Sequence, residues 1–347
     1  MKIFNRLDFT RHPFYATVLV FLAVVTVMLL SAGSGEFPLS PAKVIAALFG
    51  FGDEFDRTIL VDFRLPRIIM ALFVGMALAV SGAILQGITK NPLASPDLIG
   101  VTAGASFAVV LFLTLFSDEN NSLTVSIQWL PLFAFAGATI TALIVFLLSW
   151  KNGIAPFRLL LIGIAVAAFM HAGTTVWILM GPIYQASQAT IWTTGSIYGA
   201  NWSQIYIIMP WVLLLIVISL LMRRQMNILE LGDDIATGVG SRVIQNRVLL
   251  LLLSTGLTGV AVAFAGGIGF VGLLAPHIAR RIVGPKFQSM VLFSAGIGAL
   301  LVLIADWIAR VAFAPVEVPA GVWTAAVGAP YFIFLLMTER KKGGTNA

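Results

Sequence analysis

The sequence of 347 residues contains no cysteine, only three histidines, and charged residues at just 10% of its positions. The absence of cysteine excludes disulfide bonds and thiolate metal sites. No phosphate-binding loop of the form G-x-x-x-x-G-K-[ST] is present, so we do not expect the chain itself to hydrolyse ATP. Soluble domains carry about 25% charged residues. This deficit of charge, together with 59% hydrophobic residues, predicts a membrane protein.

The apolar residues form runs that are long enough to cross a bilayer. A hydrocarbon core of about 30 Å needs about 20 residues of helix, and about ten segments reach or approach that length. They are 14–32, 68–88, 98–116, 129–150, 157–180, 205–222, 246–265, 268–283, 290–314 and 321–338. We therefore predict an all-α polytopic membrane protein with a single domain, residues 1–347. Segment 187–200 is too polar and too short to cross, so we expect a short external re-entrant helix there.

Positive charge sets the predicted orientation. Most of the 21 basic residues fall on the side that would hold both termini, and such residues favour the cytoplasm. The polar segments are then a cytoplasmic N-terminal tail (1–13), an external loop (34–61) with a short helix near 41–49, a cytoplasmic loop (226–242) and a cytoplasmic C-terminal tail (339–347). In the cytoplasmic loop, Asp233 suits the N-cap of a helix that ends near Gly238. Because the basic residues are spread over short loops, the net charge of +6 does not predict nucleic-acid binding.

One pair of runs is interrupted in a characteristic way. The uncharged run 68–88 is followed by Pro92 and Pro96, which cannot continue a helix. The next run is rich in small residues, with Gly100 and Gly104 four positions apart. Small residues let membrane helices approach closely. We therefore predict a helical hairpin whose second helix packs against its neighbours through a face that contains both glycines.

The predicted spans hold almost no ionisable groups near their middles. His171 lies well inside one span, and we expect it to be a hydrogen-bonding group between packed helices rather than a proton relay. An ion-coupled secondary transporter needs ionisable groups at this depth, and an integral-membrane enzyme needs a cluster of them, so both classes are disfavoured. Segment 267–272 matches G-x-G-x-x-G but lacks a preceding strand, so we expect a corner between helices. His277 has no second ligand at helical spacing, and no metal site is predicted.

Three blocks of the sequence carry longer motifs. The first reads R-L-P-R from Arg64, then G-x-x-L-A-x-S-G-A-x-x-Q, then N-P-L-A-x-P-x-x-I-G-x-x-x-G-A. The second is G-G-I-G-F-V-G-L-L-A-P-H-I-A-R-R at 266–281, and the third, at 305–330, contains A-D-x-x-A-R, V-P-A-G-V and G-A-P. Together they closely resemble the FecCD-type permease family, the membrane subunits of bacterial ABC importers for ferric siderophores, haem and cobalamin. The resemblance implies a non-enzymatic permease without a cofactor, located in the bacterial cytoplasmic membrane.

The same resemblance implies partners and the residues that meet them. The partners are two cytoplasmic ABC ATPase subunits, an extracytoplasmic siderophore-binding protein, a second permease subunit, identical or paralogous, and membrane lipid. The ATPase would dock on Leu231, Gly232, Asp233, Asp234, Ala236, Gly238 and Gly240. The binding protein would place acidic residues on Arg64, Arg67 and Arg310, whose forked guanidinium groups suit carboxylates.

The gate and translocation path would include Trp192, Gly195, Tyr198, Gly199, Gln86, Asn91 and Pro92. The pattern W-x-x-G-S-x-Y-G at 192–199 is more similar to the siderophore branch of the family than to the cobalamin branch. An iron(III)-siderophore complex is therefore the expected cargo, with haem or cobalamin as the alternative.

Overall fold

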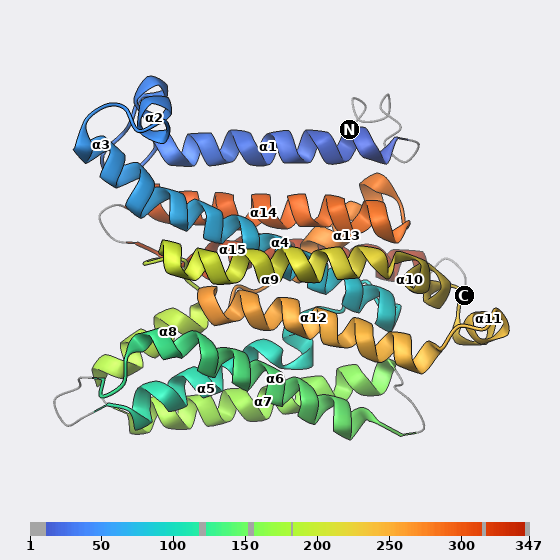
Figure 1. The fold of residues 1–347 in the computed structure, drawn as a ribbon. Helices are drawn as coiled ribbons and strands as arrows, with labels where there is room; N and C mark the ends of the chain where they lie inside the picture. Colours follow the sequence, from blue (N-terminus) through green and yellow to red (C-terminus); the bar gives the residue numbers. More distant parts are fainter. Residues whose placement is uncertain (1–11, 118–122, 152–155, 182, 314–316, 344–347) are drawn as a thin grey trace.

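The computed structural model describes residues 12–117, 123–151, 156–181, 183–313 and 317–343. Within these ranges the chain forms a bundle of long helices that run roughly alongside one another (Figure 1). The long helices are α1 (Pro13–Gly33), α4 (Leu65–Thr89), α5 (Val101–Leu115), α6 (Leu130–Ser149), α7 (Pro156–Met180), α9 (Trp202–Leu221), α12 (Val243–Ala265), α13 (Val271–Val283), α14 (Phe287–Val311) and α15 (Ala320–Gly343). Among the described residues, seven helical stretches are long and apolar enough to cross a membrane, and Val101–Leu115 and Ala320–Leu335 are shorter apolar helices. The prediction of an all-helical membrane protein is confirmed.

Short helices lie at the two ends of the bundle. They are α2 (Pro41–Leu48), α3 (Glu54–Thr58), α8 (Ile183–Thr194), α10 (Arg223–Glu230) and α11 (Asp233–Gly238). The helix predicted near 41–49 is confirmed as α2, which begins with Ser40 as its capping residue and a proline in the first turn. α2 and α3 lie at one end, whereas α10 and α11 lie at the other, together with the start of α1 and the end of α15 (Figure 1).

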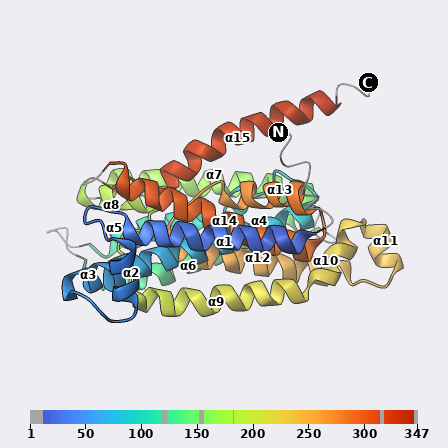
Figure 2. The same ribbon diagram turned by 90° about the horizontal axis from the view of Figure 1, so that it is seen from above.

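The structure describes the two predicted terminal tails to different extents. The N-terminal tail, 1–13, lies almost wholly outside the described residues. The predicted C-terminal tail, 339–347, begins within α15, which continues as a helix to Gly343. α15 packs against α8, α13 and α14, and then diverges from the bundle toward its C-terminal end (Figure 2).

α4 is the buried centre of the bundle. It packs against α9, α12, α13 and α14. Of the most apolar 18 residues in the helical stretch Glu54–Thr89, 83% are buried. Glycines allow the closest approach, since a Cβ atom on Gly75 would lie 2.3 Å from the carbonyl oxygen of Gly298 in α14. The hydroxyl of Ser81 lies 2.8 Å from that of Ser254 and 2.6 Å from that of Thr258 in α12. Such hydroxyls must satisfy one another, because no water is present in a bilayer core.

Both helices of the predicted hairpin pack closely against other helices, as expected. The main partners of α5 are α6 and α7, whereas α4 packs on a different set of helices (Figure 1). Gly100 has φ 80° and stands before the first residue of α5, so it does not share a helix face with Gly104. Gly104 approaches α6, because a Cβ atom there would lie 2.0 Å from the hydroxyl of Thr141. Gly100 approaches α7 instead, because a Cβ atom there would lie 3.3 Å from the backbone nitrogen of Ala167.

Two further predictions can be compared with the structure. The corner expected around 267–272 is present, since α12 ends at Ala265 and α13 begins at Val271, three residues later than the predicted span. Phe270 makes this turn with φ 66°, and its ring packs where a Cβ atom on Gly328 would stand. His171 is exposed on α7, so the prediction that it lies between packed helices is wrong.

Candidate functional site

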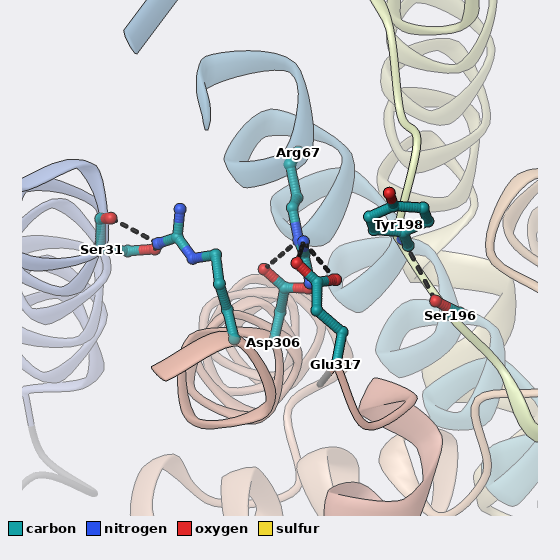
Figure 3. Close-up of polar contacts among 7 residues, drawn as sticks. Ser31, Arg67, Ser196, Tyr198, Asp306 and Glu317 are labelled. Carbon is teal, nitrogen blue, oxygen red and sulfur yellow. Dashed lines mark hydrogen bonds and ion pairs between the residues drawn. The ribbon is translucent and has the colours of Figure 1, made fainter. Parts of the chain in front are cut away.

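Arg67 lies between two carboxylates at the end of the bundle that carries α2 and α3. Its Nε donates to both carboxylate oxygens of Asp306 in α14, at 2.9 and 3.1 Å. Its Nη1 donates to both carboxylate oxygens of Glu317, at 2.9 and 2.8 Å (Figure 3). Asp306 is only 2% exposed, so its charge depends on this partner. Arg67 therefore joins α4, α14 and the segment that leads into α15.

The other two predicted docking arginines contact neutral oxygens. Arg64 ends the π-helical turn Ile59–Arg64 and donates to the carbonyl oxygens of Ala32, at 2.7 Å, and Phe37, at 2.5 Å. Arg310 donates to the carbonyl and the hydroxyl oxygen of Ser31, the latter at 2.8 Å. These contacts hold the end of α1 and the start of the external loop. Because the acceptors are neutral, they satisfy donors without cancelling the two positive charges.

The three arginines thus lie at one end of the molecule, but their side chains point in different directions. Arg64 and Arg67 were expected to project outward together, but Arg64 is directed to the α1 segment and Arg67 to α14. Both are largely buried, at 5% and 8% exposure. The acids Asp306 and Glu317, to which the sequence analysis assigned no role, complete the cluster. An acid inside a long apolar run was the available signal, since a buried carboxylate requires a cation.

The predicted gate residues lie beside this cluster. The ring centroid of Tyr198, a side chain that is 73% exposed, lies 6.0 Å from Cζ of Arg67 (Figure 3). Gly195 follows α8 with φ 89°, and its carbonyl accepts a hydrogen bond from the N–H of Gly321 at 3.0 Å. A Cβ atom on Gly321 would lie 1.8 Å from the carbonyl oxygen of Thr194. The end of α8 and the start of α15 therefore meet backbone to backbone.

The remaining predicted path residues lie elsewhere. Gln86 is 1% exposed, and its Nε2 donates to the carbonyl oxygen of Leu273 in α13 at 3.2 Å. The side-chain oxygen of Asn91 accepts from the N–H of Leu93 at 2.9 Å, which stabilises the turn that contains Pro92. These contacts are with helix backbone and a turn, and they do not join Gln86 or Asn91 to the Arg67 cluster.

The predicted ATPase-docking loop forms α10 and α11 at the opposite end. Leu231, Ile235 and Val239 are exposed by 62%, 54% and 64%, whereas Ala236 is buried. A Cβ atom on Gly232, Gly238 or Gly240 would meet no atom within 4 Å. These apolar and glycine positions form an exposed surface, and the buried Ala236 holds it against the rest of the chain.

Asp233 fixes this surface to the bundle. It was expected to be an N-cap, but Gly232 takes that position and Asp233 makes no cap hydrogen bond. Its carboxylate instead accepts from Arg247 in α12 at 2.9 Å and from Lys90 at 3.3 Å. Burial alone raises the pKa of Asp233, but the hydrogen bonds and charges of Arg247 and Lys90 outweigh burial and lower this pKa below its ordinary value.

Comparison with known proteins gives one consistent answer. The model of the FecCD transport family matches residues 21–338. YfhA of Bacillus subtilis, named as a siderophore transport system permease protein, is 53% identical over 93% of this chain and 95% of that protein. FhuG of Bacillus subtilis, an iron(3+)-hydroxamate import system permease protein, is 43% identical over 94% of this chain and 98% of that protein.

A solved structure agrees with these sequence matches. One chain of an ABC transporter described as metal-chelate type, in an inward-facing conformation, superposes with a TM-score of 0.82 at 30% identity, over 93% of this chain and 98% of that one. The family match covers most of the chain, and the superposition extends over nearly the whole helical bundle. This chain therefore belongs to the FecCD transport family and is a multi-pass membrane permease.

Proposed function

We propose that the chain is the permease subunit of a bacterial ABC importer that moves an iron(III)-siderophore complex across the cytoplasmic membrane. The observation that carries the proposal is the near full-length similarity to permeases named for siderophore and iron(3+)-hydroxamate import. The chain has no phosphate-binding loop of its own, so the energy comes from a separate ATPase subunit. Haem and cobalamin are the alternative cargoes within the same family.

The proposed topology has ten spans with both termini in the cytoplasm. It counts α13 and the two shorter apolar helices as spans, in addition to the seven long ones. α8 is then a short re-entrant helix at the outer side. The shared position of α10, α11, the start of α1 and the end of α15 supports this orientation (Figure 1), because Lys- and Arg-rich segments favour the cytoplasm.

The two ends of the bundle have different proposed partners. At the outer end, Arg64, Arg67 and Arg310 receive carboxylates of a siderophore-binding protein. At the cytoplasmic end, α10 and α11 dock an ATPase subunit through exposed apolar side chains such as Leu231 and Ile235. A second permease copy or paralogue, with a second ATPase subunit, completes the pathway around segment 192–199.

The test is reconstitution of the permease with its ATPase subunit in proteoliposomes, with the siderophore-binding protein supplied at the outer face. We expect uptake of a ⁵⁵Fe-loaded hydroxamate siderophore. This uptake should require ATP on the side of the membrane that carries the ATPase subunit, and ionophores should not affect it. Uptake that collapses with a proton or sodium ionophore would indicate a secondary transporter instead. Uptake of labelled haem or cobalamin in place of the siderophore would reassign the cargo within the family.

A further inference from the structure

The two carboxylates that hold Arg67 differ in exposure and in backbone. Asp306 belongs to α14 and its side chain is 3% exposed, whereas the side chain of Glu317 is 31% exposed. Glu317 lies in the short non-helical stretch that precedes α15. A deeply buried ion is expensive to separate from its partner, whereas a partly exposed ion is hydrated when its partner leaves. Glu317 is therefore the replaceable partner of Arg67.

We propose that Glu317 occupies, within the chain, the position on Arg67 that a carboxylate of the binding protein takes on docking. The inference rests on the proposed docking at the outer arginines and adds an internal competitor to it. Docking then breaks the Glu317–Arg67 pair and forms an equivalent pair between Arg67 and the partner's acid. Because one carboxylate replaces another on the same guanidinium donors, the net free energy of the exchange is small. Glu317 thereby sets how tightly the binding protein docks.

Release of Glu317 reaches the gate segment through a short connection. Glu317 lies three residues before α15, and Gly321 in the first turn of that helix is hydrogen-bonded to Gly195. The ring of Tyr198, from the same gate segment, lies over Arg67 (Figure 3). Arg67 therefore contacts both of the segments that meet at the Gly195–Gly321 hydrogen bond. A carboxylate that displaces Glu317 loosens the segment that positions the first turn of α15.

A purely structural ion pair behaves differently. If Glu317 only stabilised the outer end of α4, its loss would lower the melting temperature of the complex and leave docking unchanged. Loss of a competitor instead increases the affinity of docking. Its removal frees donors of Arg67 and leaves one more uncompensated positive charge beside Arg64 and Arg310. Docking affinity and thermal stability therefore separate the two roles.

The first measurement is docking of the binding protein that supports uptake, titrated onto the permease–ATPase complex in lipid nanodiscs. We expect Glu317→Gln to tighten docking by about two- to fivefold, as for a partly exposed charge pair. Glu54→Gln is the matched control, since it removes an exposed acid of α3 at the same end. We expect this control to dock like the wild type. Equal tightening in both variants would reduce the effect to overall charge and overturn the proposal.

The second measurement follows the segment itself. The chain has no cysteine, so Val318→Cys provides a single position for a spin label. We expect the label to become more mobile when the binding protein docks, and to be mobile already in the Glu317→Gln background. A label that is unchanged by docking, with unchanged affinity in Glu317→Gln, overturns the exchange.

The arginine site itself is tested separately with Arg64→Gln combined with Arg310→Gln. If this double variant weakens docking while Glu317→Gln has no effect, the arginines still receive the binding protein and only the exchange is wrong. If the double variant docks like the wild type, Arg64 and Arg310 do not receive the binding protein, and Glu317→Gln alone then decides the exchange at Arg67.

Discussion

The side-chain methyl group of Met226 in α10 lies against Gly87 in α4, where an added Cβ atom would stand 1.8 Å from it. Met226 is fully buried, so this contact seats α10 in a notch at the end of α4. We expect Gly87→Leu to displace α10 at an overpacking cost of about 1–3 kcal/mol and to reduce ATP-driven uptake. Membrane insertion should be unaffected, which detergent extraction and gel filtration would show.

Room for the new side chain provides the control for that variant. Met226→Ala combined with Gly87→Leu should recover part of the uptake, because the methyl group no longer competes for the notch. No recovery would mean that Gly87 acts through something other than its contact with Met226.

Gly104 should be essential to the packing of α5 on α6. In Gly104→Leu the new Cβ atom would lie 2.0 Å from the hydroxyl of Thr141 and 2.7 Å from the carbonyl oxygen of Gly137. Because a backbone oxygen cannot rotate away, we expect a lower melting temperature of the assembled complex and unchanged cargo preference. Gly256→Ala is the control, since its nearest neighbour is a leucine methyl group at 3.4 Å. Equal melting temperatures for the two variants would contradict the prediction.

Acid should loosen the ATPase-docking surface through Asp233. Its pKa is lowered in the folded chain, so the stabilisation from its ionised form is present above the ordinary pKa and is lost as pH falls through the lowered value. We expect the protection of the backbone amides in 226–242 against hydrogen exchange, corrected for the intrinsic effect of pH, to fall as pH drops below about 4. Asp233→Asn should abolish that acid dependence, whereas Asn at the neighbouring, exposed Asp234 should preserve it. The same acid profile in wild type and Asp233→Asn would exclude this carboxylate as the cause.

The outer arginines should contribute charge to docking. Glutamine at Arg64 and Arg310 keeps an N–H donor for the carbonyl groups of Ala32 and Ser31 but removes both charges. We expect the double variant to dock the binding protein about tenfold more weakly at low salt, with a smaller difference at high salt. Expression and basal ATPase activity should persist. Arg57→Gln, at an exposed position of α3, is the control, and an equal loss there would mean that no specific contact is involved.

The sequence predicts well those features that the bilayer alone decides. An uncharged run of membrane length has one stable backbone solution, a helix, and this is why α4 and its end before Pro92 were expected correctly. The helix break at Gly266 and Phe270 followed from glycine content and the absence of a dinucleotide-binding context. Each of these inferences needs only local residues and the solvent.

Features that depend on distant partners could not be predicted. The bond between Arg67 and Asp306 joins residues 239 positions apart, and nothing local to either residue selects the other. The same reasoning applies to α5, whose small residues indicate close packing but do not identify α6 as the neighbour. Arg64 was expected to face outward because the family resemblance assigned it to the binding protein. The structure instead directs Arg64 to two backbone carbonyl groups, those of Ala32 in α1 and Phe37 just after it.

The burial of α4 has a consequence for how the chain is assembled. All four of the helices that pack against it most, α9, α12, α13 and α14, are synthesised later. On leaving the ribosome, α4 is hydrophobic enough to enter the bilayer alone, but its Ser81 hydroxyl then faces lipid without its partners in α12. Biogenesis must therefore hold an early helix in lipid until the last third of the protein arrives to enclose it.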